Sequence, residues 1–219
     1  MRDRFDGIGM TSRRTRGRLV ERLRAEGIRD QRVLDVIRAV PRHIFVDEAL
    51  SSRAYEDTAL PIGAGQTISQ PYVVARMTEA LVAGGSLDRV LEIGTGCGYQ
   101  TAILSRFAAE VYSIERIQSL LAQARRRLHD LNIHNVRLRH GDGEKGWPEH
   151  APYDGILVAA APASVPAALI DQLGDGGRLV IPLGHGNAQD LKLITRSGDE
   201  LEEQILDRVA FVPMVSGLG

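Results

Sequence analysis

The fold can be worked out from ten residues, LEIGTGCGYQ at 91–100. They continue an apolar run, RVLEI at 89–93, that predicts a strand, and they lead into a segment that predicts a helix as far as about residue 108. Between the two elements stand Gly94, Gly96 and Gly98. Glycines at such a turn allow backbone angles that other residues avoid, and they let a ligand approach the main chain. The stretch therefore predicts a cofactor loop between a strand and a helix.

The next strand supplies a second cofactor signal. EVYSIE at 110–115 predicts a strand, and Glu115 is its last residue. An acidic side chain at this place accepts hydrogen bonds from both hydroxyls of a ribose, and it usually stands about 20 residues after the first glycine. The glycine loop alone is a weak indication, but the loop and Glu115 constrain each other. Together they predict a site for a cofactor that contains a nucleoside.

The remainder of the chain predicts an α/β fold. Beyond residue 85, apolar strands alternate with helices, so most of the sheet should be parallel, and the last two strands could form an antiparallel edge. Before residue 85 the periodicity is helical, with Gly27 ending one helix and Pro41 the next. We therefore expect a single domain, 1–219, in which residues 1–84 form an N-terminal helical and substrate-loop region and residues 85–219 a cofactor-binding α/β core. Later strands are predicted at 135–140, 154–160, 178–183, 190–196 and 201–212.

Composition excludes several classes of protein. The chain has 219 residues, 43% of them hydrophobic, which is enough for a sizeable core, and a net charge of −1, which would not attract nucleic acid or an anionic membrane. A single cysteine excludes a disulfide framework and a cysteine-based zinc site. The N-terminus has no apolar leader and no apolar run reaches about 18 residues, so we expect a cytoplasmic protein. The Arg-rich residues 1–24 predict a solvated helical face rather than a nucleic-acid arm.

Details of the loop favour one cofactor. Its glycines follow the spacing G-x-G-x-G with Tyr99 next, whereas a dinucleotide loop needs its third small residue one place later. Glu92 would place a negative charge beside the loop, which repels a pyrophosphate but suits the sulfonium and ammonium groups of S-adenosylmethionine. Both details favour that cofactor over NAD. GDG at 141–143 is either a plain turn or, at the same sheet edge as Glu115, a place where Asp142 contacts adenine.

Seven stretches of the chain resemble the protein-L-isoaspartate O-methyltransferase family. They are VPRHIFV (40–46), ALPIGAGQTISQPYVVARMTEAL (59–81), VLEIGTGCGYQTAIL (90–104), VYSIERI (111–117), GDGEKGWPEHAPYDGILVAAA (141–161), GGRLVIPLG (176–184) and FVP (211–213). GQTISQP at 65–71 is far more diagnostic of the family than any glycine loop. Departures are small, since Cys97 stands where serine is common and the Arg-rich start resembles an extension. The resemblance implies a Rossmann-like class I methyltransferase fold, with a mostly parallel seven-stranded sheet flanked by helices and preceded by N-terminal helices.

The resemblance also implies a site and a reaction. In this family GQTISQP lies over the methyl-donor site and its serine contacts the substrate carboxylate, which assigns Ser69 as the catalytic-site residue. The donor is S-adenosyl-L-methionine, the product S-adenosyl-L-homocysteine, and no metal is used. The substrates are damaged peptides and proteins, whose L-isoaspartyl residues carry a free α-carboxylate, and the methyl ester then closes to a succinimide. The implied cofactor contacts are Glu92, Gly94, Thr95, Gly96, Gly98, Glu115, Arg116, Asp142 and Gly143, and the implied substrate contacts are Gln66, Thr67, Ile68, Ser69, Val73 and Val212. We expect a monomer with no nucleic-acid or membrane partner.

Elementary chemistry limits what Ser69 must do. A carboxylate with a pKa of about 4 is already ionised at pH 7, so no general base is required. A sulfonium is already an activated donor, so the reaction needs neither a metal nor a covalent intermediate. What remains is in-line placement of oxygen and methyl and removal of water from the carboxylate. Ser69 should therefore orient the carboxylate rather than attack, in a shallow groove formed by residues 65–73 and FVPM at 211–214.

Other functions make different demands on the sequence. A serine hydrolase needs a partnered histidine, and no nucleophile elbow such as G-x-S-x-G accompanies the six histidines. Amino-methylating nucleic-acid enzymes commonly carry an Asp/Asn-Pro-Pro-aromatic stretch after the fourth strand, where this chain has VAAAPAS at 158–164. A non-catalytic binding module and an enzyme that esterifies a normal aspartate in one dedicated partner remain as alternatives. We expect Cys97 to be a packing residue, and Trp147 to be either loop packing or a wall of the peptide groove.

Overall fold

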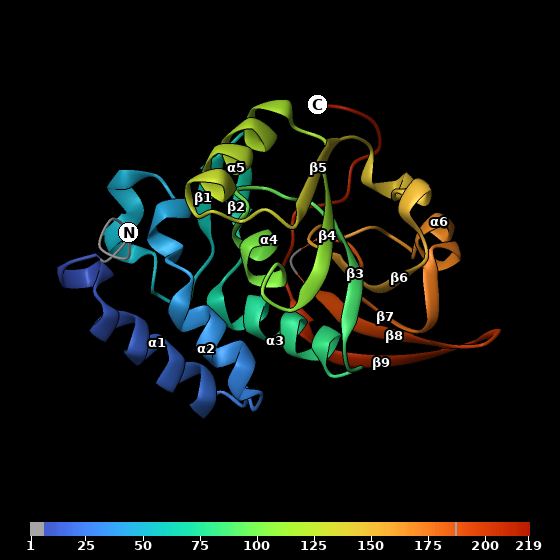
Figure 1. Cartoon of the computed structure of the whole chain (residues 1–219), viewed down its shortest axis with the longest axis horizontal. Coiled ribbons are helices and arrows are strands. Elements are labelled where there is room, and N and C mark those ends of the chain that lie inside the picture. Colours follow the sequence, from blue (N-terminus) through green and yellow to red (C-terminus); the bar gives the residue numbers. More distant parts are fainter. Residues whose placement is uncertain (1–6, 187) are drawn as a thin grey trace.

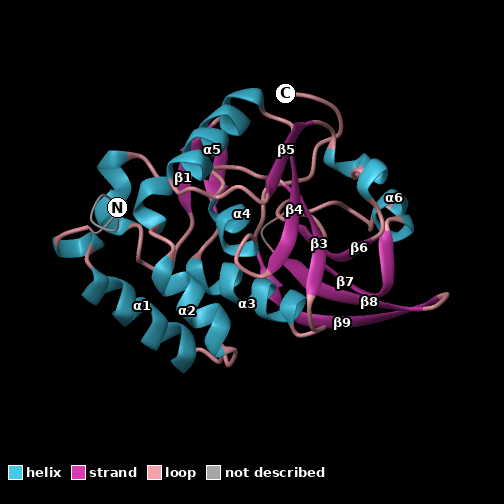
Figure 2. Cartoon of the chain, viewed as in Figure 1, coloured by secondary structure: helices cyan, strands magenta, loops and turns pink. Residues whose placement is uncertain are grey.

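A seven-stranded sheet forms the centre of the computed structural model, which describes residues 7–186 and 188–219 (Figure 1; Figure 2). The strand order is β5-β4-β3-β6-β7-β8-β9; the first five strands in this order are parallel, and β8 and β9 are antiparallel to their neighbours. This confirms the predicted sheet with its antiparallel edge. The strands are β3 (Leu87–Ile93), β4 (Ala108–Glu115), β5 (Val136–His140), β6 (Tyr153–Val158), β7 (Leu173–Leu183), β8 (Gln189–Ser197) and β9 (Glu200–Val209).

The strand order determines where a ligand can bind. The chain passes outward from β3 to β4 and β5, and β6 then returns to the other side of β3. In open parallel sheets, ligands bind outside the carboxyl ends of the strands, at the point where the order reverses. Here that point lies between the loop that follows Ile93 and the segment that follows Val158. The glycine loop therefore lies where the topology favours a site.

Several predicted boundaries are wrong by a few residues. Helix α4 (Tyr99–Leu104) ends well before residue 108, because two successive tight turns, in which Arg106 and Phe107 donate to carbonyls three residues earlier, lead directly into β4. Strand β9 ends at Val209 rather than at 212. Strand β7 begins at Leu173, earlier than the apolar run at 178–183 indicates, since the glycines in its first half weaken the strand signal.

Three longer helices precede the parallel sheet in the chain, namely α1 (Arg13–Ala25), α2 (Gln31–Ala39) and α3 (Pro71–Val82). Gly27 ends α1 as predicted: its φ is +110°, and the Ile28 N–H donates to the Leu23 carbonyl at 3.1 Å, which is the geometry of a Schellman cap. The helices that follow the glycine loop are α4, α5 (Gln118–Asp130) and α6 (Ala167–Asp171). No described helix is long and apolar enough to span a bilayer.

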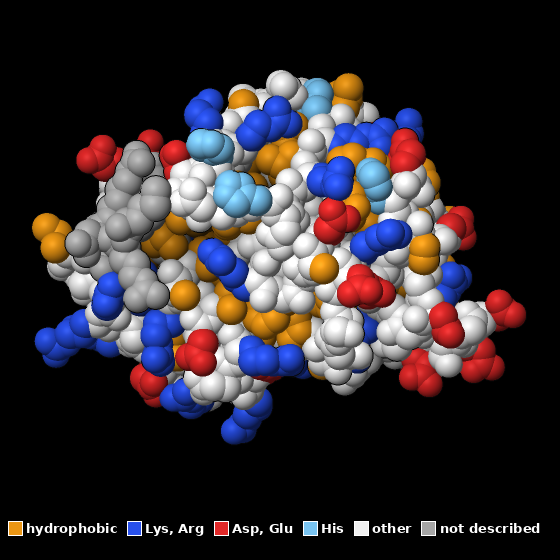
Figure 3. Space-filling view, in the orientation of Figure 1, with side chains coloured by type: hydrophobic (Ala, Val, Ile, Leu, Met, Phe, Trp, Pro, Cys, Tyr) orange, Lys and Arg blue, Asp and Glu red, His pale blue; other side chains and the backbone are white. Residues whose placement is uncertain are grey.

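Charge is spread unevenly over the surface (Figure 3). Lys and Arg side chains gather over α1 and α2, whereas acidic side chains gather at the tip of the β8–β9 hairpin, around Asp199 and Glu200. The predicted solvated arginine face needs a correction, because Arg16 is only 6% exposed and Arg22 donates to the Tyr55 carbonyl at 2.6 Å. Part of this arginine cluster therefore packs against the protein. Arg2 and Arg4 lie outside the described residues.

A short hairpin that the sequence did not predict interrupts the helical region. Strands β1 (Leu60–Gly63) and β2 (Gln66–Ile68) pair in antiparallel fashion. The two residues between them, Ala64 and Gly65, have φ of +50° and +68°, as in a type I′ turn. Alanine rarely adopts positive φ, so the sequence Ala-Gly does not carry the usual Asn-Gly signal of such a turn. The motif GQTISQP is therefore the second strand of a hairpin followed by the start of α3.

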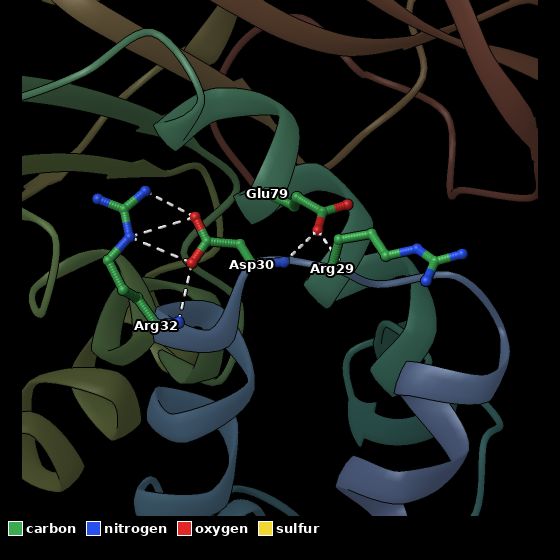
Figure 4. Close-up of polar contacts among 4 residues, drawn as sticks. All are labelled: Arg29, Asp30, Arg32 and Glu79. Carbon is green, nitrogen blue, oxygen red and sulfur yellow. Dashed lines mark hydrogen bonds and ion pairs between the residues drawn. The ribbon is translucent and has the colours of Figure 1, made fainter.

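One joint connects the N-terminal helices to α3 (Figure 4). The Glu79 carboxylate of α3 accepts the backbone N–H groups of Arg29 and Asp30, at 2.6 and 2.7 Å. Asp30 in turn caps α2 by accepting the Arg32 N–H at 2.8 Å, and it also pairs with the Arg32 guanidinium. Buried side chains of α1, α2, α3 and one face of the sheet form a continuous cluster. The assignment of residues 1–84 and 85–219 to two regions of one domain stays a prediction.

Candidate active site

The glycine loop takes the shape that its sequence predicts. Gly94, Gly96 and Gly98 have φ of +92°, +54° and +90°, a region that other residues rarely adopt. A Cβ on Gly98 would also lie 3.2 Å from Cβ of Ala124, because α5 packs closely against the loop. Glycine is therefore required at these positions by backbone conformation, and at Gly98 by helix packing as well.

Glu115 holds this loop and lines the space beside it. Its side chain is 6% exposed, and its two carboxylate oxygens accept the N–H groups of Gly96 at 2.8 Å and Ile117 at 2.9 Å. Each oxygen keeps a second lone pair for a further donor. Glu115 lies in the walls of two neighbouring cavities, one of which also has Arg116 and Gly143 in its wall. The loop and the end of β4 thus come together as predicted.

Asp142 already has hydrogen-bond partners in this structure. One oxygen accepts the Glu144 N–H at 3.1 Å and the other accepts the Gly217 N–H at 2.9 Å. The second bond brings the C-terminal residues to the site, where Met214 and Val215 line the same cavity as Arg116. Gly143 is tightly placed, since a Cβ there would clash with Cγ2 of Ile93. No pattern in the sequence predicts that the C-terminal residues lie here.

GQTISQP lies directly over the glycine loop. A single cavity is lined by Gln66, Thr67, Ile68 and Ser69 from the hairpin, by Gly94, Thr95 and Gly96 from the loop, and by Glu115 and Val212. Ser69 and Thr67 also line a second, larger groove of about 750 Å³ on the other side. Ser69 therefore stands between the space beside the glycine loop and the open groove. Nothing in the hydrophobic pattern indicates this arrangement, which was predicted from the family resemblance alone.

Comparison with known proteins agrees with this geometry. The model of the family described as protein-L-isoaspartate(D-aspartate) O-methyltransferase (PCMT) matches residues 14–219. The chain belongs to this family. A protein-L-isoaspartate O-methyltransferase of Halorhodospira halophila is 62% identical over 211 residues, which cover 96% of each chain. The prediction of the family from the sequence is confirmed.

Two solved structures have the same fold. One, named protein-L-isoaspartate O-methyltransferase, superposes with a TM-score of 0.83 at 31% identity, over 93% of this chain and 67% of that one. The other, described as a beta-aspartate methyltransferase (PCMT) from Plasmodium falciparum in complex with S-adenosyl-L-homocysteine, has a TM-score of 0.78 at 26% identity, over 90% and 97%. They confirm the predicted fold of a class I methyltransferase with additional N-terminal helices.

Glu92 lies in the protein interior, a position that was not predicted from the sequence. Its carboxyl is completely buried, outside the walls of both cavities beside the loop, and it accepts the hydroxyls of Thr101 and Ser113 at 2.5 Å. Burial raises the pKa of Glu92 from 4.5 to about 8, so the group is mostly neutral at pH 7. The expectation that Glu92 places a negative charge beside the cofactor is therefore not supported, because the carboxyl is buried and its pKa is raised. Ser113 also contacts the Thr95 hydroxyl at 2.6 Å, so Glu92 supports the loop from within.

The large groove contains residues that were not predicted from the sequence. Tyr72 and Asp207 line it together with the predicted Val73 and Val212, and the Tyr72 hydroxyl donates to Asp207 at 2.9 Å. Burial, with the neighbouring Asp207 carboxylate, raises the pKa of Tyr72 to about 12. These residues are 135 positions apart in the chain, and no local pattern connects them.

Two residues with alternative interpretations can now be placed. Trp147 belongs to an aromatic cluster with Tyr112, His150 and Tyr153, and it is not among the residues that line the groove. The loop-packing interpretation therefore describes it better than a groove wall. Cys97 is 3% exposed, and burial raises the pKa of its thiol. It lines the cavity above the loop as a small buried side chain, as expected.

Proposed function

We propose that the chain esterifies the free α-carboxylate of L-isoaspartyl residues in damaged peptides and proteins, with S-adenosyl-L-methionine as the methyl donor. Membership of the PCMT family supports the reaction. The residue assignment depends on one observation. Ser69 lies in the wall of the cavity over the glycine loop and also in the wall of the open groove. Thr67, Ala159 and Val212 line both spaces as well, so a carboxylate bound from the groove would reach the donor side past Ser69 and these neighbours.

The residues beside the loop fit the proposed donor. Positive-φ glycines bring the main chain close to the cavity without side chains, and the end of β4 supplies Glu115, whose remaining lone pairs can accept two ribose hydroxyls. Gly94, Thr95, Gly96, Gly98, Arg116, Asp142 and Gly143 complete the proposed binding set, and Glu92 belongs to it as a buried support. When bound, the donor supplies an activated methyl group. The residues of the chain position the donor, orient the substrate carboxylate and exclude water.

On the acceptor side, β2, the connection at Ser69 and the first turn of α3 hold the substrate. Ser69 and Thr67 offer hydroxyls that can hydrogen-bond a carboxylate while leaving it ionised. Gln66, Ile68, Val73 and Val212 form the walls around it. Placement of oxygen against methyl in a water-excluded site provides the rate enhancement, because both reactants are already activated. A monomeric state and a cytoplasmic location stay predictions from the sequence.

One assay tests the proposal. Tritiated methyl transfer is measured to an isoaspartyl peptide and to a peptide of the same sequence with normal aspartate. We expect at least a tenfold preference for the isoaspartyl peptide, about 1.4 kcal/mol. Equal rates would favour an enzyme that esterifies normal aspartate in one partner. Transfer to RNA or DNA instead would exclude the repair function, and donor binding without any transfer would favour a binding module.

A further inference from the structure

Arg42 is a completely buried cation next to the backbone of Ser69, the residue proposed to orient the substrate carboxylate. It lies in the short helical segment Arg42–Phe45, within the stretch VPRHIFV, and its relative exposure is 0%. Its Nη2 donates to the Ser69 carbonyl at 2.7 Å and its Nε to the Ala54 carbonyl at 2.8 Å. The Arg42 guanidinium therefore ties the end of GQTISQP to the N-terminal region. None of the roles assigned above uses this residue.

Among the described residues, no carboxylate contacts the Arg42 guanidinium. It donates to the two carbonyls, the neutral Tyr99 hydroxyl also interacts with it, and its Nη1 is buried without a hydrogen-bond partner. The titratable groups that act on it most are Tyr99, Cys97 and Tyr55, none of which is negative at neutral pH. Burial lowers the pKa of Arg42, yet a guanidinium stays protonated in proteins.

A purely structural link would not need this charge. Burying an unpaired ion is costly, and an apolar side chain of similar volume would fill the space at lower cost. The Tyr99 ring, 4.9 Å from Cζ of Arg42, offsets only part of that cost. Tyr99 and Ser69 both line the cavity over the loop, so the two groups that cover Arg42 are also walls of the site.

The site itself has little positive charge for an anionic substrate. No Lys or Arg occurs among the described residues that line the cavity over the loop. The groove has one, Arg208, which is paired with Asp190 at 3.0 Å. The same walls carry the carboxylates of Glu115 and Asp207. Apart from the sulfonium of the bound donor, an isoaspartyl carboxylate entering here would meet mainly negative charge, and a cation behind the wall would compensate for it.

We propose that Arg42 is a positioning residue for methyl transfer, which fixes Ser69 through its carbonyl and provides the positive charge that favours the substrate carboxylate. This inference rests on the proposed function and adds to it the source of carboxylate recognition. The link to the Ser69 carbonyl holds the serine where its hydroxyl meets the acceptor. The guanidinium acts at short range in a buried setting, where a charge is weakly screened. The partial positive charge at the start of α3 acts in the same direction, although the Asp57 carboxylate, which accepts the Tyr72 N–H there, offsets part of it.

Two variants separate the two parts of this role. Arg42→Met removes both the charge and the hydrogen bonds. Arg42→Lys keeps the charge but cannot reproduce the two-carbonyl geometry of the guanidinium. Arg22→Met is the matched control, because Arg22 also donates to a carbonyl of the same loop, that of Tyr55, but makes no bond to Ser69.

The decisive measurement is a binding ratio. With S-adenosyl-L-homocysteine present, calorimetry compares an isoaspartyl peptide with the same peptide in which the α-carboxylate is a neutral carboxamide. We expect the wild type to favour the carboxylate about tenfold, and Arg42→Met to reduce the ratio to about threefold or less, since α3 still contributes. Arg22→Met should keep the full ratio. The affinity for S-adenosyl-L-homocysteine itself should change less than about threefold in every variant.

Kinetics test the positioning part. For Arg42→Met we expect KM for the isoaspartyl peptide to rise and kcat to fall, with a loss in kcat/KM of about 10- to 100-fold. For Arg42→Lys we expect the binding ratio to persist while kcat falls at least about threefold. If Arg42→Met does not fold, the Lys variant decides: a wild-type kcat overturns the positioning role, and a lost ratio overturns the charge role.

Three further outcomes are distinguishable. An unchanged ratio and unchanged kinetics in a folded Arg42→Met variant overturn the inference and leave the proposed function intact. Absence of methyl transfer to the isoaspartyl peptide by the wild type overturns the proposed function itself. An equal loss of donor and peptide affinity would mean that Arg42 supports the fold in general, which also contradicts the inference.

Discussion

On the donor side of the site, between residues 91 and 117, three positive-φ glycines and one buried carboxylate shape the loop within a short stretch of chain. On the acceptor side, between residues 57 and 72, side chains from outside the stretch take part: Arg42 donates to the Ser69 carbonyl at 2.7 Å, and Asp207 accepts the Tyr72 hydroxyl at 2.9 Å. The donor side is built mainly by local conformation and the acceptor side by hydrogen bonds across the fold. Substitutions should therefore affect the two sides separately.

The largest expected effect concerns the buried carboxyl of the donor side. Because the pKa of Glu92 is raised from 4.5 to about 8 in the folded state, the unfolded chain loses this proton first as pH rises. The contribution of Glu92 to the free energy of unfolding should therefore fall by about 1.4 kcal/mol for each pH unit between about 4.5 and 8, and level off above.

Urea unfolding of the wild type and of Glu92→Gln, at several pH values, isolates this contribution. The difference between the two proteins cancels the other titrating groups, and the variant should gain relative stability as pH rises. Curves that run parallel from pH 5 to 8 would show that Glu92 is ionised in the folded protein. In that case the charge expected from the sequence would be present beside the loop after all.

The second prediction tests donor binding. Glu115→Ala removes a carboxylate that holds the Gly96 N–H and, in the proposed complex, the ribose hydroxyls. Charge-assisted hydrogen bonds contribute roughly 1.5–3 kcal/mol, so the affinity for S-adenosyl-L-homocysteine should fall about 10- to 150-fold by calorimetry. Glu110→Ala, at the exposed other end of the same strand, is the control and should leave the affinity unchanged. Equal affinities in both variants would show that Glu115 does not contact the donor.

The difference between the locally built donor side and the acceptor side, which depends on distant segments, also explains which features could be predicted from the sequence. The glycine loop, Glu115 and the parallel strands follow from residues close together in the chain, where turn chemistry and apolar periodicity act. The β1–β2 hairpin was missed, because Ala64 takes a positive φ that local propensity opposes. Tyr72 with Asp207 and the Gly217 contact to Asp142 join segments far apart, which no single-sequence pattern connects. The role of GQTISQP came from family resemblance for the same reason.

The third prediction concerns the acceptor side. If Ser69 only orients the carboxylate, Ser69→Ala loses one hydrogen bond to a charged group, about 1.5–3 kcal/mol in the transition state. The value of kcat/KM should fall by one to two orders of magnitude, while donor affinity stays near that of the wild type. Ser105→Ala, which removes a hydroxyl bound to a helix carbonyl away from the site, is the matched control.

A nucleophilic serine would behave differently. Activity would fall by many orders of magnitude in Ser69→Ala, and mass spectrometry would detect a methylated wild-type enzyme. The pH profile gives an independent check, because an already ionised acceptor should give a nearly flat rate between about pH 6 and 8. A steep rise across this range would indicate a general base that the structure has not identified.

The smallest effect is expected at the joint between the N-terminal helices and α3. Glu79→Gln keeps an oxygen for the N–H groups of Arg29 and Asp30 but removes the negative charge that strengthens both bonds. We expect the free energy of unfolding to fall by about 1 kcal/mol, which corresponds to a decrease of about 2–4 °C in Tm for a chain of this size. Donor affinity should be unaffected, since the donor loop is shaped by its own backbone.

Glu21→Gln provides the comparison for Glu79. Each glutamate pairs with an arginine three residues away in its helix, Arg24 for Glu21 and Arg76 for Glu79. The Glu21 side chain is 64% exposed and that of Glu79 only 15%, and an exposed pair contributes little. Glu21→Gln should therefore leave Tm unchanged within about 1 °C. Equal shifts in both variants would mean that the backbone bonds of Glu79 contribute no more than a surface charge, and that this joint does not hold the acceptor side to its helices.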